Sequence, residues 1–339
     1  MPPSRPIHAL GIRRRRTAGV LRSRLTAGVA TRFAGVAAAL VAVIALAACG
    51  TSAAATPVEG SGDPDAIAVV ASTNVWGDIA SAIGGDLVRV DAFISDPAQD
   101  PHSFEASPRA QLQVAQAAVI IENGGGYDDF MDGLISASGT TATVINAVQV
   151  SGLTAPPGGD LNEHVWYDFA TVDAVAGRIA DALSAVDPSA SADFAGNLAG
   201  FRQQLAALRA QVETIKGAHA GEQVAITEPV PLYLLSAAGL VNATPAEFSE
   251  AIEEGSDVPA RVLLAMLNLF RDKQVRVLVY NSQTSGPQTD QVLRAAQDNG
   301  IPGVPVTETL PAGKDYLSWM QDNVSALAAA LTGASGASS

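Results

Sequence analysis

The longest periodic segment of the chain lies between residues 188 and 219. Apolar residues recur there every three or four positions, at Phe194, Leu198, Phe201, Leu205, Leu208, Val212 and Ile215. This spacing puts them on one helix face and predicts a single amphipathic helix of roughly 30 residues. Because no strand pattern interrupts the segment, we expect the helix to join two lobes as a stiff spine.

Short apolar segments alternate with helical patterns on both sides of this helix. The expected strands are residues 67–72, 87–94, 118–121 and 143–145 before it, and 223–226, 275–280 and 304–306 after it. Such alternation is typical of parallel sheets covered by helices. The sequence therefore predicts an α/β fold class, with two small α/β lobes at residues 66–187 and 220–333 joined by the spine helix at 188–219. A disordered tail is expected at 334–339.

The N-terminal segment has the pattern of an export signal. Eight of the 20 basic residues and none of the 34 acidic residues precede Cys49, and residues 33–48 are apolar and small. A basic segment, an apolar core and small residues in sequence indicate a signal peptide at 1–48. The core ends in Leu-Ala-Ala-Cys-Gly, which resembles the bacterial lipobox, so Cys49 is the expected site of lipidation. A plain signal peptide and an uncleaved anchor helix are the alternatives.

The remainder of the chain is strongly acidic and holds no second cysteine. Residues 49–65 are rich in Gly, Pro and small polar residues, the composition of a flexible tether. The excess of acidic over basic residues after Cys49 argues against a nucleic-acid partner. With one cysteine, an intrachain disulfide is impossible.

Two histidines stand on predicted loops of the first lobe. His102 follows the strand at 87–94, within Asp-Pro-His-Ser-Phe-Glu-Ala-Ser-Pro at residues 100–108, and flanking prolines stiffen this loop. Open α/β sheets bind ligands at the carboxyl ends of their strands. His164 follows a Gly- and Pro-rich loop and precedes Trp166 and Tyr167. The alternatives are a solvated turn residue for His102 and a polar neighbour of core aromatics for His164.

Two glutamates follow predicted strands of the second lobe. Glu228 comes after the strand at 223–226, and Glu308 comes after the strand at 304–306. Either carboxylate alone could be a helix cap or a solvated charge. Together with two imidazoles, they form a mixed nitrogen and oxygen set of the kind that binds Zn²⁺, Mn²⁺ or Fe²⁺.

In the identity and order of its motifs, the chain resembles the metal-binding lipoproteins of manganese and zinc ABC transporters, the ZnuA/TroA-like solute-binding proteins. The resemblance rests on the lipobox, the motif around His102, the His-Val-Trp-Tyr-Asp motif at 164–168, the spine helix and the segment at 315–320. It covers residues 66–333. By this resemblance, the metal ligands are His102, His164, Glu228 and Glu308, and the site lies in the cleft between the lobes. Asp315 is the alternative to Glu308.

The resemblance implies a receptor and not an enzyme. Such a protein captures Mn²⁺ or Zn²⁺ outside the cytoplasm, anchored by lipid to the outer face of the cell membrane, and delivers the ion to an ABC permease. We expect a monomer with no catalytic residues or catalytic cofactor and with little lobe movement. Two carboxylate ligands favour Mn²⁺ slightly, and affinity should fall with pH because the ligands bind metal deprotonated. A surface adhesin with the same fold and a metal-dependent hydrolase are the alternatives.

Overall fold

The computed structural model describes residues 65–96, 99, 104–156 and 159–333, all within one compact unit. The segments that hold the predicted signal peptide, Cys49, most of the tether, His102 and the tail lie outside these residues. In the described part of the chain, no helix has the length and apolar character needed to cross a membrane.

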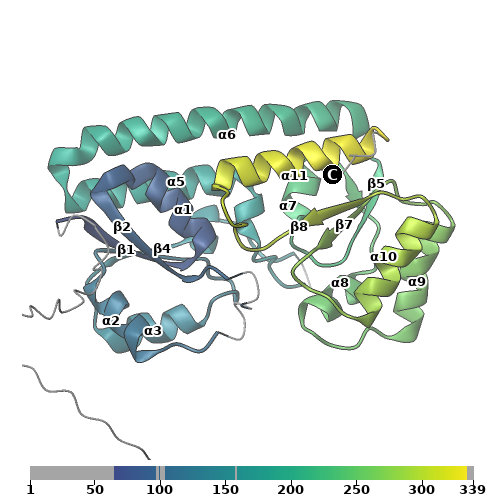
Figure 1. Cartoon of the computed structure of the whole chain (residues 1–339), viewed down its shortest axis with the longest axis horizontal. Helices are drawn as coiled ribbons and strands as arrows, with labels where there is room; N and C mark the ends of the chain where they lie inside the picture. Colours follow the sequence, from purple (N-terminus) through teal and green to yellow (C-terminus); the bar gives the residue numbers. More distant parts are fainter. Residues whose placement is uncertain (1–64, 97–98, 100–103, 157–158, 334–339) are drawn as a thin grey trace, which may run out of the picture. The chain divides into compact units, whose positions relative to one another are not determined.

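The first lobe is a parallel four-stranded sheet with helices on both faces (Figure 1). Its elements are β1 (Ile67–Thr73), α1 (Asn74–Gly84), η1 (Gly85–Leu87), β2 (Val88–Ile94), α2 (Pro108–Gln116), β3 (Val119–Glu122), α3 (Phe130–Ser138), β4 (Thr143–Asn146), α4 (Ala147–Ser151), η3 (Val165–Tyr167) and α5 (Phe169–Val186). The strand order is β2-β1-β3-β4, and every pairing is parallel.

The second lobe repeats this architecture. Its elements are β5 (Gln223–Ile226), α7 (Leu232–Ala237), β6 (Val241–Asn242), α8 (Ala246–Glu253), α9 (Ala260–Arg271), β7 (Leu278–Asn281), α10 (Pro287–Asp298), β8 (Gly303–Val306) and α11 (Tyr316–Leu331). The order is β6-β5-β7-β8, again entirely parallel. The predicted α/β class, with two lobes and a spine helix, is confirmed.

Side chains of each strand alternate between two separate cores. In β1, Val69 and Ala71 join the cluster under α1 and α5, whereas Val70 joins a second cluster with α2 and α3. In the second lobe, Val224 faces the first of these clusters and Ala225 packs with α8 and α9. The central strands β1, β3, β5 and β7 are therefore buried on both faces, which explains why their sequences are nearly continuous apolar segments.

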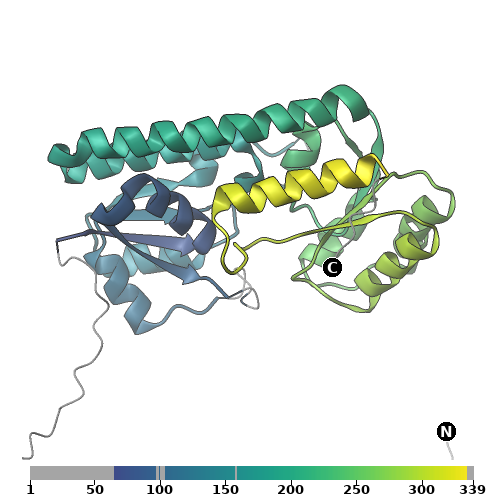
Figure 2. The same ribbon diagram turned by 45° about the horizontal axis from the view of Figure 1, so that its top comes forward.

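The spine helix α6 (Ser191–His219) follows a short 3-10 turn, η4 (Pro188–Ala190). Its apolar stripe is buried at Phe194, Phe201, Leu205, Leu208, Val212 and Ile215. It packs on α1 and α5 of the first lobe, on α7 of the second, and along α11, which lies beside it (Figures 1 and 2). The largest buried apolar cluster therefore continues from one lobe into the other.

Hydrogen bonds also connect the two lobes near the ends of α11. The Tyr316 hydroxyl donates to the Trp166 carbonyl at 2.7 Å, and the Tyr167 hydroxyl donates to the Thr307 carbonyl at 2.7 Å. The backbone N–H of Tyr316 donates to Asp78 Oδ2 at 2.7 Å. The segments that carry His164 and Glu308 are thus held against a common core.

Some sequence-based assignments differ from the structure. The helical pattern of the sequence extends from Tyr127 to Ile135, but the helix begins only at Phe130, as α3 (Phe130–Ser138). The turn after Gly124 to Gly126 continues through Asp128, whose carboxylate accepts the N–H groups of Asn123 and Gly124. The elements β6, α8 and α9 were not assigned from the sequence, although Pro245 and Pro259 directly precede the two helices.

Candidate metal site

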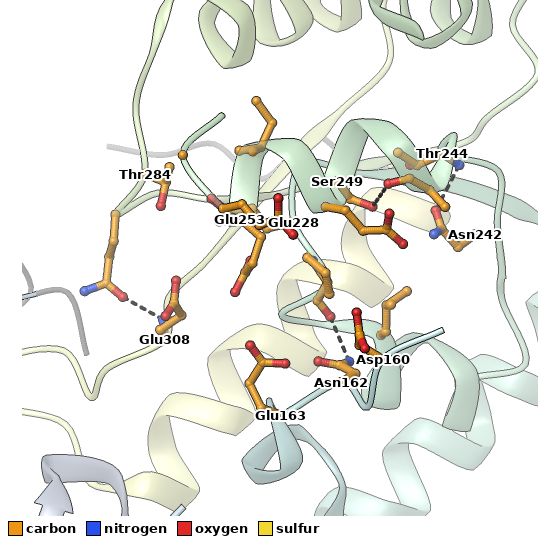
Figure 3. Close-up of a pocket in the computed structure, with 18 of the residues that line it drawn as sticks. Asp160, Asn162, Glu163, Glu228, Asn242, Thr244, Ser249, Glu253, Thr284 and Glu308 are labelled. Carbon is orange, nitrogen blue, oxygen red and sulfur yellow. Dashed lines mark hydrogen bonds between the residues drawn. The ribbon is translucent and has the colours of Figure 1, made fainter. Parts of the chain in front are cut away.

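An acidic pocket of about 940 Å³ lies between segments of the two lobes. The first lobe contributes Asp160, Asn162 and Glu163, and the second contributes Glu228, Glu250, Glu253, Glu254 and Glu308 (Figure 3). Among the described residues that line it, none is Lys or Arg. Such a pocket attracts cations.

His164 is held rigidly at the first-lobe side of this pocket. Four residues later, Asp168 caps α5 by accepting the N–H groups of Ala170 and Thr171, which fixes the short turn that begins at Val165. The imidazole is completely buried, and it packs against the rings of Tyr127 and Trp166. Trp166 of the motif is therefore a core residue that also packs against the His164 ring.

The ring nitrogens of His164 have different partners. Nδ1 lies 2.7 Å from Asn162 Oδ1, and the Asn162 amide is oriented by donating from Nδ2 to the Pro229 carbonyl. Because Asn162 Oδ1 is an acceptor, Nδ1 carries the hydrogen, and Nε2 is the nitrogen available to a metal. Nε2 lies 3.3 Å from Glu253 Oε1.

The carboxylates around His164 control its protonation. Burial alone would lower the pKa of the imidazole, but contact with Glu253 and the charges of Glu308 and Glu163 raise this pKa to about 9. Metal capture at Nε2 must therefore displace a proton.

Glu228 follows β5 directly after Thr227 and is nearly completely buried. Burial, then the charges of Glu253 and Glu308, raise the pKa of its carboxyl to about 7, against the opposing effect of Asn281 and Thr284. Its Oε2 has no hydrogen-bond partner among the described residues. A buried carboxylate of this kind is costly without a cation.

Glu308 follows β8 and is half-buried. The Tyr127 hydroxyl donates to its Oε2 at 3.2 Å, and Asn281 Nδ2 donates to its Oε1 at 2.6 Å. The backbone N–H of Glu308 donates to Gln283 Oε1 at 2.6 Å. These contacts hold the carboxylate between the lobes, because Tyr127 belongs to the first lobe.

The structure places two of the four predicted ligands, Glu228 and Glu308, in the lining of the pocket. His164 is buried, with Nε2 3.3 Å from the lining residue Glu253, and the charge of Glu308 acts on its imidazole. His102 lies outside the described residues. Asp315, the alternative to Glu308, is exposed and caps α11 by accepting the Ser318 N–H at 2.7 Å, and it does not line the pocket.

Glu253 is a site residue that the sequence analysis did not identify. It is the last residue of α8, and one ligand atom each from Glu163, His164 and Glu253 lie within 4.8 Å of one another. No predicted strand precedes Glu253, so the rule that located Glu228 and Glu308 does not apply to it. The only signal was the Glu-Glu-Gly sequence at 253–255, which marks the end of a helix.

Comparison with known proteins finds a matching family and similar metal-binding proteins. The family model described as zinc-uptake complex component A, periplasmic (ZnuA), matches residues 69–330. The manganese-binding lipoprotein MntA of Halalkalibacterium halodurans is 27% identical over 163 residues, which are 48% of this chain and 53% of that protein. MntA of Bacillus subtilis is 24% identical over 280 residues, covering 78% of this chain and 85% of that protein.

A solved structure supports the same assignment at the level of fold. The periplasmic zinc-binding protein TroA from Treponema pallidum aligns with a TM-score of 0.66 at 17% identity, over 78% of this chain and 98% of that one. The resemblance inferred from the sequence motifs is confirmed, and the chain belongs to the ZnuA family of zinc-uptake complex components.

Proposed function

We propose that this protein captures a divalent transition metal ion, Mn²⁺ or Zn²⁺, outside the cytoplasm and delivers it to an ABC permease. The observation that carries the proposal is that buried His164 of the first lobe lies 3.3 Å from Glu253, in the lining of a pocket that also holds Glu228 and Glu308 of the second lobe. His102, predicted from the sequence, would complete the ligand set. The names of the MntA and TroA relatives, a manganese-binding lipoprotein and a periplasmic zinc-binding protein, support binding of a metal ion.

The donor set suits a hard or borderline cation. Two carboxylates and imidazole ligands bind Zn²⁺, Mn²⁺ and Fe²⁺, and carboxylates favour Mn²⁺ more than thiolates or added imidazoles do. The pocket collects several negative charges without a lysine or arginine among its described lining residues, so a divalent ion relieves their mutual repulsion. Protons compete for the same ligands, and affinity should fall as the pH decreases.

We also propose that a lipid anchor holds the receptor at the membrane, where it meets the permease. Lipidation at Cys49 and the tether at residues 49–65 would hold the receptor on the outer face of the membrane, within reach of the permease. The ion is cargo, so the protein needs no catalytic group, and a single chain contains the whole site. The continuous core along α6 favours a small lobe movement on binding rather than wide closure.

Competitive titration tests this proposal. The soluble protein from residue 66 should bind one Mn²⁺ or Zn²⁺ ion per chain, and His164→Ala and Glu228→Ala should each weaken binding at least about 100-fold, because each removes a ligand from a different lobe. Asp181→Ala, an exposed change on α5, is the matched control. Micromolar or weaker binding by the parent protein, or parent-like affinity in both ligand variants, would contradict the proposal.

A further inference from the structure

Glu253 enters the metal pocket from an element that carries none of the predicted ligands. It ends α8, which packs beside the second sheet, and its carboxylate lies among those of Glu163, Glu228 and Glu308 (Figure 3). The side chain of Glu253 is 14% exposed, so it is mostly withdrawn from water. An acidic side chain placed here needs a cationic partner.

His164 alone cannot be that partner for the whole cluster. One imidazolium offers a single positive charge, whereas four glutamates line this end of the pocket. His164 Nε2 makes an ion pair with Glu253 Oε1 at 3.3 Å and is buried without a hydrogen-bond partner in the described chain. Glu228 Oε2 is also buried without a hydrogen-bond partner there. Both atoms are potential metal ligands.

The spacing of the atoms agrees with shared coordination. Two ligand atoms bound to one ion at about 2.1 Å lie about 3 to 3.5 Å apart. The distance from His164 Nε2 to Glu253 Oε1 is 3.3 Å, so one ion can contact both atoms with little movement of either side chain. A ligand atom of Glu163 lies near the same pair, since one atom each from Glu163, His164 and Glu253 lie within 4.8 Å of one another.

We propose that Glu253 binds the transported ion directly and determines which metal the site prefers. This inference rests on the proposed function, since it concerns the same ion. With Glu253, the described set contains three carboxylates beside the imidazole of His164, so oxygen donors predominate. More oxygen ligands and a higher coordination number favour Mn²⁺, whereas Zn²⁺ usually takes four ligands. Loss of Glu253 should therefore affect Mn²⁺ more than Zn²⁺.

Two substitutions separate ligation from simple charge. Glu253→Gln removes the anionic ligand, and it should weaken Mn²⁺ at least about 100-fold but Zn²⁺ no more than about 10-fold. Glu253→Asp keeps the charge but is one methylene shorter, so it too should weaken Mn²⁺ and should change the spectrum of bound Co²⁺. Asp257→Asn, which removes an exposed charge just beyond α8 that does not line the pocket, is the matched control and should leave both affinities within about threefold.

The outcomes are distinguishable from failure of the proposed function. If the parent protein binds no Mn²⁺ or Zn²⁺, the function itself fails. If the parent binds tightly and Glu253→Asp keeps parent affinity and an unchanged Co²⁺ spectrum, Glu253 acts through its charge and direct ligation is overturned. Equal weakening of Mn²⁺ and Zn²⁺ in Glu253→Gln overturns its role in metal preference. Should Glu253→Gln fail to fold by circular dichroism, the Glu253→Asp comparison alone decides.

Discussion

At the scale of single residues, the site depends on groups that orient its ligands. Asn162 fixes the tautomer of His164, and Asn281 and Tyr127 hold the two oxygens of Glu308. Partners of metal ligands typically contribute as strongly to affinity as the shape of the pocket, because they set ligand direction and basicity. Tyr127 is notable because its hydroxyl reaches Glu308 from the opposite lobe.

Removing that hydroxyl should therefore weaken metal binding without removing a ligand. Tyr127→Phe keeps the buried ring but leaves Glu308 Oε2 without this donor, and we expect affinity to fall about 10-fold. Isothermal titration with competing chelators measures the change. Tyr280→Phe, on β7 away from the pocket, is the control. Parent affinity in Tyr127→Phe would show that the hydrogen bond does not position Glu308.

The sequence located these residues unequally, and the reason is physical. Glu228 and Glu308 could be predicted because a carboxylate directly after a buried strand must lie at the carboxyl edge of a sheet. Glu253 could not be predicted, because its approach to His164 depends on how α8 packs and not on any local pattern. Tyr127 reads as an ordinary core aromatic in the sequence, and only its hydroxyl's contact with Glu308 reveals a second role.

At the scale of elements, helix caps connect local sequence to site geometry. Asp168 accepts hydrogen bonds from the N–H groups of Ala170 and Thr171 and from the Thr171 hydroxyl, which anchors α5 next to the turn that follows His164.

The strands and long helices could be predicted from the spacing of their apolar residues and from their composition. The helices α8 and α9 were missed because the strand before them, β6, has only two residues and gives no apolar segment to separate them.

Removal of the α5 cap tests this connection. Asp168→Ala should lower the free energy of unfolding by about 1 to 2 kcal/mol, because the first N–H groups of α5 lose their acceptor. Asp181→Ala, in the exposed middle of α5, should change it by less than about 0.5 kcal/mol. Chemical denaturation compares the two variants. Equal stability would mean that the cap contributes nothing to the helix.

At the scale of the whole described unit, the two lobes together support the proposed metal site, and each lobe holds only part of its ligand set. In the proposed site, the first lobe would supply His164 and the second Glu228, Glu253 and Glu308, while α6 and α11 pack against each other along a shared core. Interlobe hydrogen bonds at Trp166 and Thr307 hold the surrounding segments. This arrangement explains how a metal pocket can be largely formed before the ion arrives.

The most direct measurement is a crystal structure of the Mn²⁺-loaded protein with anomalous diffraction data that locate the ion. We predict a single strong peak in the pocket, about 2.0 to 2.4 Å from His164 Nε2 and from carboxylate oxygens of Glu228 and Glu308. A peak outside the pocket, or bonds to one lobe only, would contradict the central claim that the two lobes bind one ion together.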